Sequence, residues 1–258
     1  MNGISVIQNI KMVETNPYPY VYTDQALPEK IYKELCDTFP EDIVTSTVPH
    51  DGGICYRYKS DQALGNKNLP QIWQDFFGYH TSKEYFNSCI DLFAKNIEKI
   101  YGNRFVDQLK AGVKTVRGVD NSGQLVTDCQ FVVHEPVDQS GTSRTPHLDN
   151  PVEIYAGLLY MKKPNDTAEG GNFTVYEQIK EITQVNKTLG RQVPDGSYKR
   201  VKEVPYKQNS FAMFLNVKNS IHGVTPRIDP LERRRSINII GEFNKTGKMW
   251  NIKEIKTK

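Results

Sequence analysis

The spacing of apolar residues changes near residue 105. Before it, apolar residues recur at intervals of three and four, which is typical of helices with one buried face. One helix is predicted between Pro28 and Pro40, since proline suits a first turn and ends a helix that reaches it. A longer helix is predicted from Thr81 or Ser82, either of which can cap it, to Gly102. We expect these helices to support a second layer.

Beyond residue 105, short runs rich in Val, Ile, Phe and Tyr alternate with Gly, Pro, Asn and Asp, which is typical of strands and turns. Several short strands at moderate spacing favour an antiparallel sandwich or barrel. The predicted strands cover residues 130–134, 154–161, 172–177, 210–215 and 236–243.

A polar stretch interrupts these strands at residues 178–207. It carries seven Lys and Arg residues against three Asp and Glu residues. It is predicted to form a long hairpin or lid inserted between core strands, with a solvated surface loop as the alternative. The basic residues 244–258 are predicted to form a partly frayed tail.

Length and composition exclude several classes of protein. A chain of 258 residues with 38% hydrophobic and 24% charged residues can bury a core and is neither disordered nor membrane-spanning in character. No apolar run approaches the ~18 residues that a membrane helix needs, and the first residues lack the pattern of a secretion signal. The net charge of +3 is too small to indicate nucleic acid. The four cysteines form no CxxC pair, which predicts reduced thiols and a cytoplasmic location.

A candidate metal site begins at His147 and Asp149. Residues two apart on an extended strand point to one face, so this imidazole and carboxylate can hold one divalent ion. His222 is the best candidate for a third ligand. Two histidines and one carboxylate on one side of a metal form the facial triad of non-haem Fe(II) oxygen chemistry. A His-x-Asp pair also arises by chance, so a structural or surface role stays open for this pair alone.

A candidate carboxylate site follows His222. On a strand, Arg234, Ser236 and Asn238 share one face, while apolar residues occupy the other. A guanidinium beside a hydroxyl can grip a carboxylate through paired hydrogen bonds. The alternative is that Arg233, Arg234 and Arg235 form a basic surface run, although an apolar strand directly after them favours at least one inward-pointing arginine.

These motifs resemble those of the 2-oxoglutarate and Fe(II)-dependent oxygenases. The shared order is His147-x-Asp149, then His222, then Arg234-x-Ser236. The segments His147-Leu-Asp-Asn-Pro151, Gly157-Leu-Leu-Tyr-Met161 and Glu169-Gly-Gly-Asn-Phe173 are similar to the prolyl-hydroxylase branch, and also to bacterial and phage oxygenases of uncharacterised activity. The resemblance covers roughly residues 125–243.

The resemblance implies a mainly β fold with supporting helices. We expect a double-stranded β-helix, which is a jelly-roll or cupin-like barrel, packed on N-terminal helices. The expected organisation is a single domain over residues 1–258. Within it, residues 1–124 would supply helical support and substrate loops, 125–243 the barrel, and 244–258 the tail.

The resemblance also implies roles for individual residues. His147, Asp149 and His222 would ligate iron. Arg234 would pair with the distal carboxylate of 2-oxoglutarate, with Ser236 beside it.

Three further positions are assigned less uniquely by the resemblance. Tyr160 either hydrogen-bonds the same carboxylate or is a barrel-core tyrosine, and Ala156 and Leu158 would share its inward face. Upstream, where the branch often has a tyrosine, this chain has His134 or Gln130. His134 is either a contact to the co-substrate or an ordinary core or rim histidine.

The implied chemistry is hydroxylation. Fe(II), 2-oxoglutarate as co-substrate and O2 would be required, with ascorbate as a candidate reductant, and succinate and CO2 would be released. Because Asp149 supplies a carboxylate ligand, no position is left vacant for chloride. The sequence therefore predicts hydroxylation or a related oxidation rather than halogenation.

The substrate is not fixed by the sequence, since oxygenases of this kind select substrates with loops and flanking segments. A small molecule or free amino acid is favoured, and a prolyl or other peptidyl hydroxylase is the first alternative. A cupin-like barrel that binds a metal or sugar without catalysis is an alternative of another class. Residues 51–58 form either a recognition loop or a loop leading into a strand. The oligomeric state and biological source stay open.

Overall fold

The computed structural model describes residues 3–50, 54–136, 145–187 and 190–251, and the backbone of 253–254. The first three residues of the predicted recognition segment 51–58 therefore lie outside the described residues. Residues 137–144, which follow the predicted strand 130–134, lie outside them too, as does most of the tail beyond residue 251.

Helices fill the N-terminal half of the described chain, as the apolar spacing predicts. Ser82 caps α5, because its side-chain oxygen accepts a hydrogen bond from the backbone N–H of Tyr85. Tyr32 and Leu35 form the buried side of α1. The helices are α1 (Glu29–Asp37), α2 (Glu41–Thr45), α3 (Ser60–Ala63), α4 (Gln71–His80), α5 (Lys83–Leu92), α6 (Ala94–Tyr101) and α7 (Asn103–Ala111).

The prediction of one helix from residue 81 to 102 is wrong in one respect. The segment forms two helices, α5 and α6, which meet at Phe93. The backbone of Phe93 leaves the helical region at φ −98° and ψ 7°, while its side chain is fully buried. Burial of this ring, together with a redirected α6, overrides the helical spacing that runs through both segments.

The five predicted strands are present; two of them, residues 125–134 and 234–243, begin before their predicted starts, and the other three match within one residue at each end. Four of them lie together at the centre of a seven-stranded sheet, in the order β1-β10-β5-β13-β4-β2, with β3 beside β4. Its strands are β1 (Tyr20–Thr23), β2 (Cys55–Tyr58), β3 (Lys114–Val116), β4 (Leu125–His134), β5 (Glu153–Tyr160), β10 (Phe211–Leu215) and β13 (Arg234–Phe243).

A smaller sheet faces the large one. It consists of β11 (His222–Val224), β7 (Phe173–Gln178) and β9 (Tyr198–Val204), in that order. A bridge between His147 and His222 adds the segment around His147 at its edge. Two short pairs complete the described strands, β6 (Glu169–Gly170) with β12 (Arg227–Ile228), and β8 (Gln184–Val185) with β14 (Lys253–Glu254).

Successive strands therefore alternate between two facing sheets, which is a double-stranded β-helix. The strand β4 enters the large sheet, the His147 segment joins the small one, β5 returns to the large one, and β7 to the small one. β10, β11 and β13 repeat the alternation. The expected fold class, a jelly-roll barrel with supporting helices, is confirmed.

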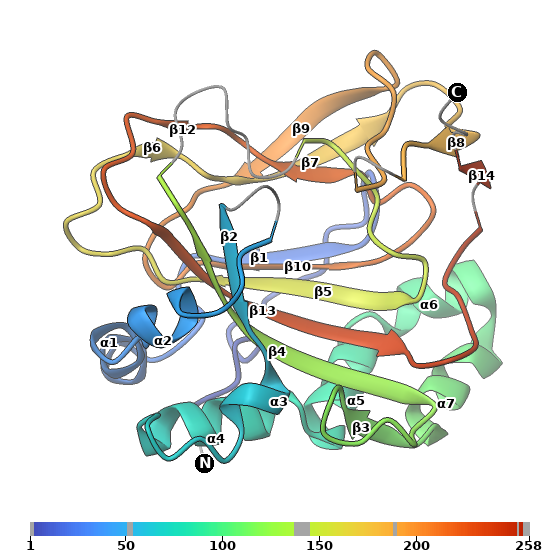
Figure 1. Ribbon diagram of the computed structural model, residues 1–258. Coiled ribbons are helices and arrows are strands. Elements are labelled where there is room, and N and C mark those ends of the chain that lie inside the picture. The colour runs from blue at the N-terminus through green and yellow to red at the C-terminus, as the bar shows by residue number, and fades with distance from the viewer. Residues whose placement is uncertain (1–2, 51–53, 137–144, 188–189, 252, 255–258) are drawn as a thin grey trace.

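The two faces of the large sheet have different partners (Figure 1). The helices lie beneath one face in this view, and β7 and β9 lie above the other. On the helix side, the Phe131 ring of β4 contacts Trp73 and Phe77 of α4, with ring centroids 4.6 Å apart in both pairs. Because side chains alternate along a strand, the neighbours of Phe131 face the small sheet. The helices thus hold one wall of the space between the sheets.

The polar stretch 178–207 is partly sheet. β9 pairs antiparallel with β7 over Phe173–Gln178, although its outer face carries exposed basic residues. Val185 and Val193 are fully buried. The stretch therefore supplies one arm of a hairpin whose other arm is β7, and a fully solvated loop is excluded for its described residues.

The structure also bears on two sequence predictions, namely that the cysteines are reduced and that the chain lacks membrane-spanning helices. No disulfide joins Cys36, Cys55, Cys89 and Cys129, all of which are described. In the described part of the chain, every helix is too short or too polar to span a bilayer.

Candidate metal centre

Two histidines lie side by side at the inner end of the small sheet. The backbone N–H of His147 donates to the carbonyl of His222 at 2.9 Å, and the N–H of His222 donates back to His147 at 3.1 Å. This reciprocal pair is that of two directly opposed residues on antiparallel strands. It places the imidazoles together, with ring centroids 4.3 Å apart.

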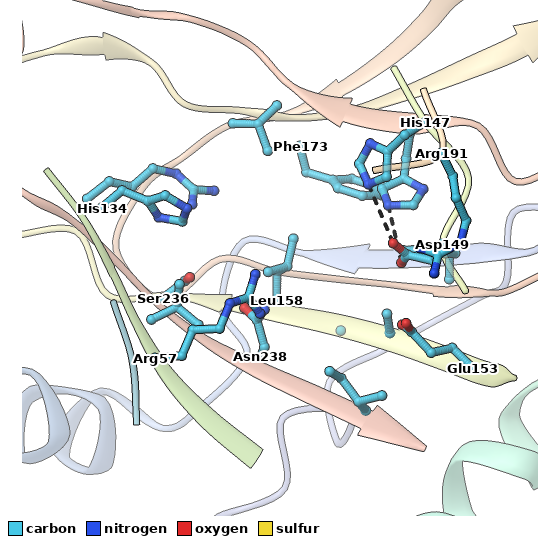
Figure 2. Close-up of a pocket in the computed structure, with 18 residues that line it drawn as sticks. Arg57, His134, His147, Asp149, Glu153, Leu158, Phe173, Arg191, Ser236 and Asn238 are labelled. Carbon is cyan, nitrogen blue, oxygen red and sulfur yellow. Dashed lines mark ion pairs between the residues drawn. The ribbon is translucent and has the colours of Figure 1, made fainter. Parts of the chain in front are cut away.

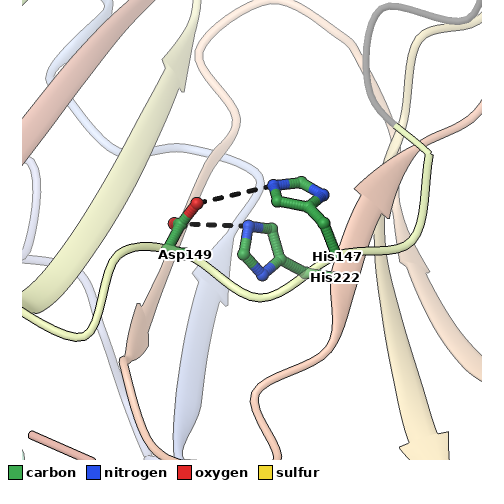
Figure 3. A group of neighbouring side chains, drawn as sticks. All are labelled: His147, Asp149 and His222. Atoms are coloured by element: carbon green, nitrogen blue, oxygen red, sulfur yellow. Dashed lines mark ion pairs between the residues drawn. The ribbon is translucent and has the colours of Figure 1, made fainter. Parts of the chain in front are cut away.

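Asp149 lies across from both imidazoles (Figure 3). One carboxylate oxygen is 3.4 Å from Nε2 of His147, and the other is 3.4 Å from Nε2 of His222. One ligand atom from each of the three residues lies within 4.8 Å of the others. The structure therefore brings the three predicted ligands to one point.

Backbone carbonyls orient both rings. Nδ1 of His147 lies 2.7 Å from the carbonyl of Thr145, and Nδ1 of His222 lies 2.9 Å from the carbonyl of Ser220. A carbonyl can only accept, so each Nδ1 carries a proton, and each Nε2 faces Asp149, where it can donate as an imidazolium or, as a neutral imidazole, bind a metal ion. Metal-ligating histidines are oriented by second hydrogen bonds of this type.

The carboxylate of Asp149 is held ionised. Burial alone would raise its pKa, but the charge of His222 and the hydrogen bonds from both histidines outweigh it and hold the pKa well below the usual range. An ionised carboxylate and two imidazole nitrogens form a donor set that suits Fe(II) and other first-row divalent metals.

A cavity of about 250 Å³ opens beside these three residues (Figure 2). Its floor is the inner face of the large sheet, where Arg234, Ser236 and Asn238 of β13 alternate with residues that face the other way. Ala156 and Leu158 of β5 line the same space, as predicted. The period of two along these strands therefore places the predicted face inward.

Arg234 is buried in this cavity, with 3% of its surface exposed. Its guanidinium lies 5.1 Å from the ring centres of both Tyr160 and Tyr206, and its Nε donates to the carbonyl of Gly171 at 3.2 Å. Its Nη2 has no hydrogen-bond partner among the described residues. A buried guanidinium fixed on one side with a donor unused on the other is suited to an anionic ligand.

Two hydroxyl groups near Arg234 are also buried without a hydrogen-bond partner among the described residues. Ser236 and Tyr160 are direct register partners on β13 and β5, and both are fully or almost fully buried. Neither hydroxyl has a hydrogen-bond partner in the described chain. Burial raises the pKa of Tyr160 while the charge of Arg234 opposes the rise, so the phenol keeps its proton and can donate. A carboxylate beside Arg234 would satisfy these groups.

His134 ends β4 and lines the same cavity, opposite Arg234 in the strand register. Gln130, the other residue considered there, accepts a hydrogen bond from Arg57 at 3.1 Å and donates to Asp128 at 2.6 Å. Of the two, His134 is the one that lines the cavity wall.

Sequence reasoning left three charged residues of the cavity unassigned, namely Arg57, Glu153 and Arg191. Arg57 falls in the segment considered for recognition, and Arg191 in the basic stretch, but neither was singled out. Glu153 sits near the start of β5, where burial, Asp149 and Glu242 raise its pKa to about 8. Local sequence holds no signal for these three, because distant strands bring them together.

His80 is a buried histidine outside the cavity lining. It ends α4 and is fully buried. Its Nε2 accepts from the backbone N–H of Val6, and Nδ1 lies 2.8 Å from the carbonyl of Phe76. It supports the fold and is remote from the cavity lining.

No protein-family model and no curated protein matches the chain. Solved structures similar to it include a prolyl 4-hydroxylase from Pseudomonas putida, with 14% identity, a TM-score of 0.46, and 88% of this chain and 93% of that chain covered. A non-haem α-ketoglutarate-dependent carbocyclase, SnoK from nogalamycin biosynthesis, is 11% identical with a TM-score of 0.47, and 87% of this chain and 80% of that chain are covered. A prolyl hydroxylase from Trichoplax adhaerens in complex with a peptide fragment is 11% identical with a TM-score of 0.43, and 90% of this chain and 86% of that chain are covered.

Proposed function

We propose that this protein is an Fe(II)- and 2-oxoglutarate-dependent dioxygenase that hydroxylates a small molecule. The observation that supports it most is the pairing of two sites across one cavity. His147, Asp149 and His222 converge at one end, and the buried guanidinium of Arg234 lies in the same cavity with an unused donor. A co-substrate that chelates a metal at one end and carries a carboxylate at the other suits this pairing.

The three metal ligands match the proposed ion. Both imidazoles direct Nε2 toward one carboxylate, and the backbone carbonyls hold both rings in that orientation through Nδ1. Three protein ligands leave further coordination positions for co-substrate and oxygen. Bound there, Fe(II) would supply the oxygen activation that couples conversion of 2-oxoglutarate to succinate and CO2 with oxidation of the substrate.

The residues around Arg234 match the proposed co-substrate. Arg234 would grip the distal carboxylate of 2-oxoglutarate, while the hydroxyls of Ser236 and Tyr160 would donate to it. His134 would contribute to the same wall. Phe173 and Phe214 line the cavity near His222 and would exclude water from the reacting centre.

The cavity size favours a small substrate. At about 250 Å³ it is smaller than the 300–1,000 Å³ of pockets for drug-sized ligands, and it has to hold the co-substrate as well. Little volume is left for a peptide side chain with its flanking backbone. A peptidyl hydroxylase therefore stays the second candidate, and ascorbate stays a predicted reductant.

An anaerobic titration with Fe(II) and 2-oxoglutarate tests this function. We expect a visible absorption band from charge transfer between the metal and the bound keto acid, and succinate after air is admitted, even without substrate. A protein that binds Fe(II) but gives neither band nor succinate would contradict the proposal.

Arg234→Ala separates the oxygenase from a non-catalytic cupin-like barrel. The oxygenase requires Arg234 for its co-substrate, so this variant loses the absorption band and succinate release. A barrel that only binds metal or sugar gives Arg234 no role. In that case, the wild-type protein shows neither signal and the variant keeps the affinity for its ligand.

A further inference from the structure

The buried and half-buried arginines of the described chain fall into two groups. Four that are buried or half-buried outside the cavity have carboxylate partners: Arg117 with Asp128 and Glu242, Arg227 with Asp166, Arg233 with Glu135, and Arg235 with Glu41. The three that line the cavity, Arg57, Arg191 and Arg234, form no ion pair among the described residues. Buried and half-buried arginines usually pair, so the exceptions mark where anions bind.

Arg234 is accounted for by the proposed co-substrate, and Arg191 lies close enough to Glu153 to lower the pKa of that carboxyl. Arg57 has neither kind of partner. Its one hydrogen bond goes from Nη1 to the amide oxygen of Gln130 at 3.1 Å, which fixes the guanidinium and leaves its other donors toward the cavity. It comes from β2, two strands away from Arg234 in the large sheet.

Asn238 offers a second polar group beside Arg57. It is the direct register partner of Gln130 across β13 and β4, so its amide lies beside the guanidinium that Gln130 holds (Figure 2). The Asn238 side-chain oxygen is buried and has no hydrogen-bond partner in the described chain. A buried acceptor without a partner is unfavourable, and a hydrogen-bond donor on a ligand would relieve this cost.

We propose that Arg57 and Asn238 anchor the substrate, and that the substrate is a small free acid with a hydrogen-bond donor next to its carboxylate, such as a 2-amino or 2-hydroxy acid. Arg57 takes the carboxylate, and the amide oxygen of Asn238 accepts from the neighbouring N–H or O–H. One guanidinium balances one carboxylate charge, whereas a phosphate dianion would leave a charge unbalanced in the cavity. This inference rests on the proposed function and specifies its substrate class.

Calorimetry with the protein loaded with Mn(II) and 2-oxoglutarate tests the inference without turnover. Binding of Mn(II) and 2-oxoglutarate is measured first, and its failure would contradict the proposed function itself. Common L-amino acids and their 2-hydroxy analogues are then titrated as probes. We expect at least one to bind, and the better series shows whether the donor is N–H or O–H. The matching carboxamide is expected to bind at least ~10-fold more weakly, since it lacks the charge.

The variants are Arg57→Met and Arg57→Gln, with Arg104→Met as a matched control on the exposed side of α7. Either Arg57 variant is expected to weaken binding of the free acid roughly 10- to 100-fold while 2-oxoglutarate affinity is unchanged. Retained binding of Mn(II) and 2-oxoglutarate shows that the variants are folded. Arg104→Met is expected to change neither affinity.

Three results would overturn the inference while leaving the proposed function intact. The first is that no free acid binds at concentrations up to about 10 mM, an affinity weaker than the millimolar range. The second is that a carboxamide, a phosphate ester or a peptide binds as tightly as the acid. The third is that Arg57→Met weakens 2-oxoglutarate as much as it weakens the acid, which would make Arg57 a co-substrate residue.

Discussion

Asp149 is the single residue on which the metal centre depends most. Its two carboxylate oxygens each face one imidazole, so it lies between both nitrogen ligands. The same two histidines hold its pKa well below the usual range, which keeps a negative charge at the site at neutral pH. The two histidines therefore both position the carboxylate of Asp149 and keep it negatively charged.

Asp149→Ala is predicted to abolish metal binding. Loss of a group that only orients a ligand costs roughly 10–100-fold in metal affinity, so loss of the ligand itself should cost more than about 100-fold. Mn(II) affinity measured by electron paramagnetic resonance checks this. His50→Ala, at an exposed histidine, is the control and should bind as the wild type does. Equal Mn(II) affinity in a folded Asp149→Ala would contradict the assignment.

His80 predicts a pH dependence of stability that is separate from the metal site. Burial lowers its pKa to about 3, far below its ordinary value of 6.5. As pH falls below 6.5 the unfolded chain takes up a proton that the folded chain refuses, so the folded state loses stability toward pH 3. Between pH 7.5 and pH 5, this residue should remove about 2 kcal/mol from the free energy of unfolding.

Urea unfolding of the wild type and of His80→Gln at both pH values measures this effect. The variant lacks the titrating ring at position 80 but keeps the other histidines, so the difference between the two pH dependences isolates His80. We expect the variant to lose less stability than the wild type on acidification. Parallel losses in both proteins would show that His80 does not carry the effect.

At the scale of elements, the β6–β12 pair supports the co-substrate site. Gly170 of β6 pairs with Arg227 of β12, and the next residue, Gly171, accepts the hydrogen bond from Arg234. Gly170 adopts a φ of +79°, and a Cβ added there would lie 1.8 Å from the carbonyl oxygen of Pro226. No side chain can be accommodated at this position without moving the pair of strands.

Gly170→Ala is therefore predicted to lower the free energy of unfolding by at least about 2 kcal/mol and to weaken 2-oxoglutarate binding. Gly78→Ala is the matched control, because Gly78 lies within α4 with open space around its Cβ position. That change should stabilise the protein by about 0.5 kcal/mol through helix propensity. Urea unfolding of both variants checks these two stability changes. A Gly170→Ala protein as stable as the wild type would contradict the prediction.

At the scale of the whole molecule, metal and co-substrate would connect the two sheets. The metal ligands lie on the small-sheet side, while Arg234, Ser236 and Tyr160 lie on the large sheet. A ligand bound only to the folded state at about 100 times its Kd stabilises that state by about 2.7 kcal/mol. The proposed function therefore predicts a rise in Tm with Mn(II), and a further rise with 2-oxoglutarate.

Arg234→Met should keep the rise from Mn(II) and lose the further rise from 2-oxoglutarate. Arg233→Met is the control, since Arg233 is one-third exposed and pairs with Glu135 outside the cavity lining. Thermal unfolding with each ligand separates the two variants. If Arg234→Met keeps the full response to 2-oxoglutarate, Arg234 is not its anchor.

The repeating patterns of the sequence predict the fold well. Alternation along β13 predicts that Arg234 and Ser236 face inward and that Ile237 and Ile239 face the other way. In the structure, the first two line the cavity, while the two isoleucines are buried outside its lining. The strand cores and the capping of α5 by Ser82 follow from local chemistry in the same way. The break at Phe93 does not, because the cost of bending is offset by packing from elsewhere in the chain.

The candidate site is predictable only in part, for a related reason. His147, Asp149 and His222 carry a recognisable order, and the structure brings them together, while their roles stay proposals. Arg57 enters the cavity only because β2 pairs with the edge of β4. Which side chains face one another across two sheets depends on register, which single residues do not encode. The division of the chain at residues 124 and 243 stays a prediction.

The central claim is that one cavity holds a metal at one end and the carboxylate of 2-oxoglutarate at the other. A crystal grown without oxygen in the presence of Fe(II) and 2-oxoglutarate, with anomalous data at the iron edge, tests it most directly. The account predicts one anomalous peak between His147, Asp149 and His222, and a bound carboxylate hydrogen-bonded to Arg234. An iron peak elsewhere, or 2-oxoglutarate bound away from Arg234, would contradict it.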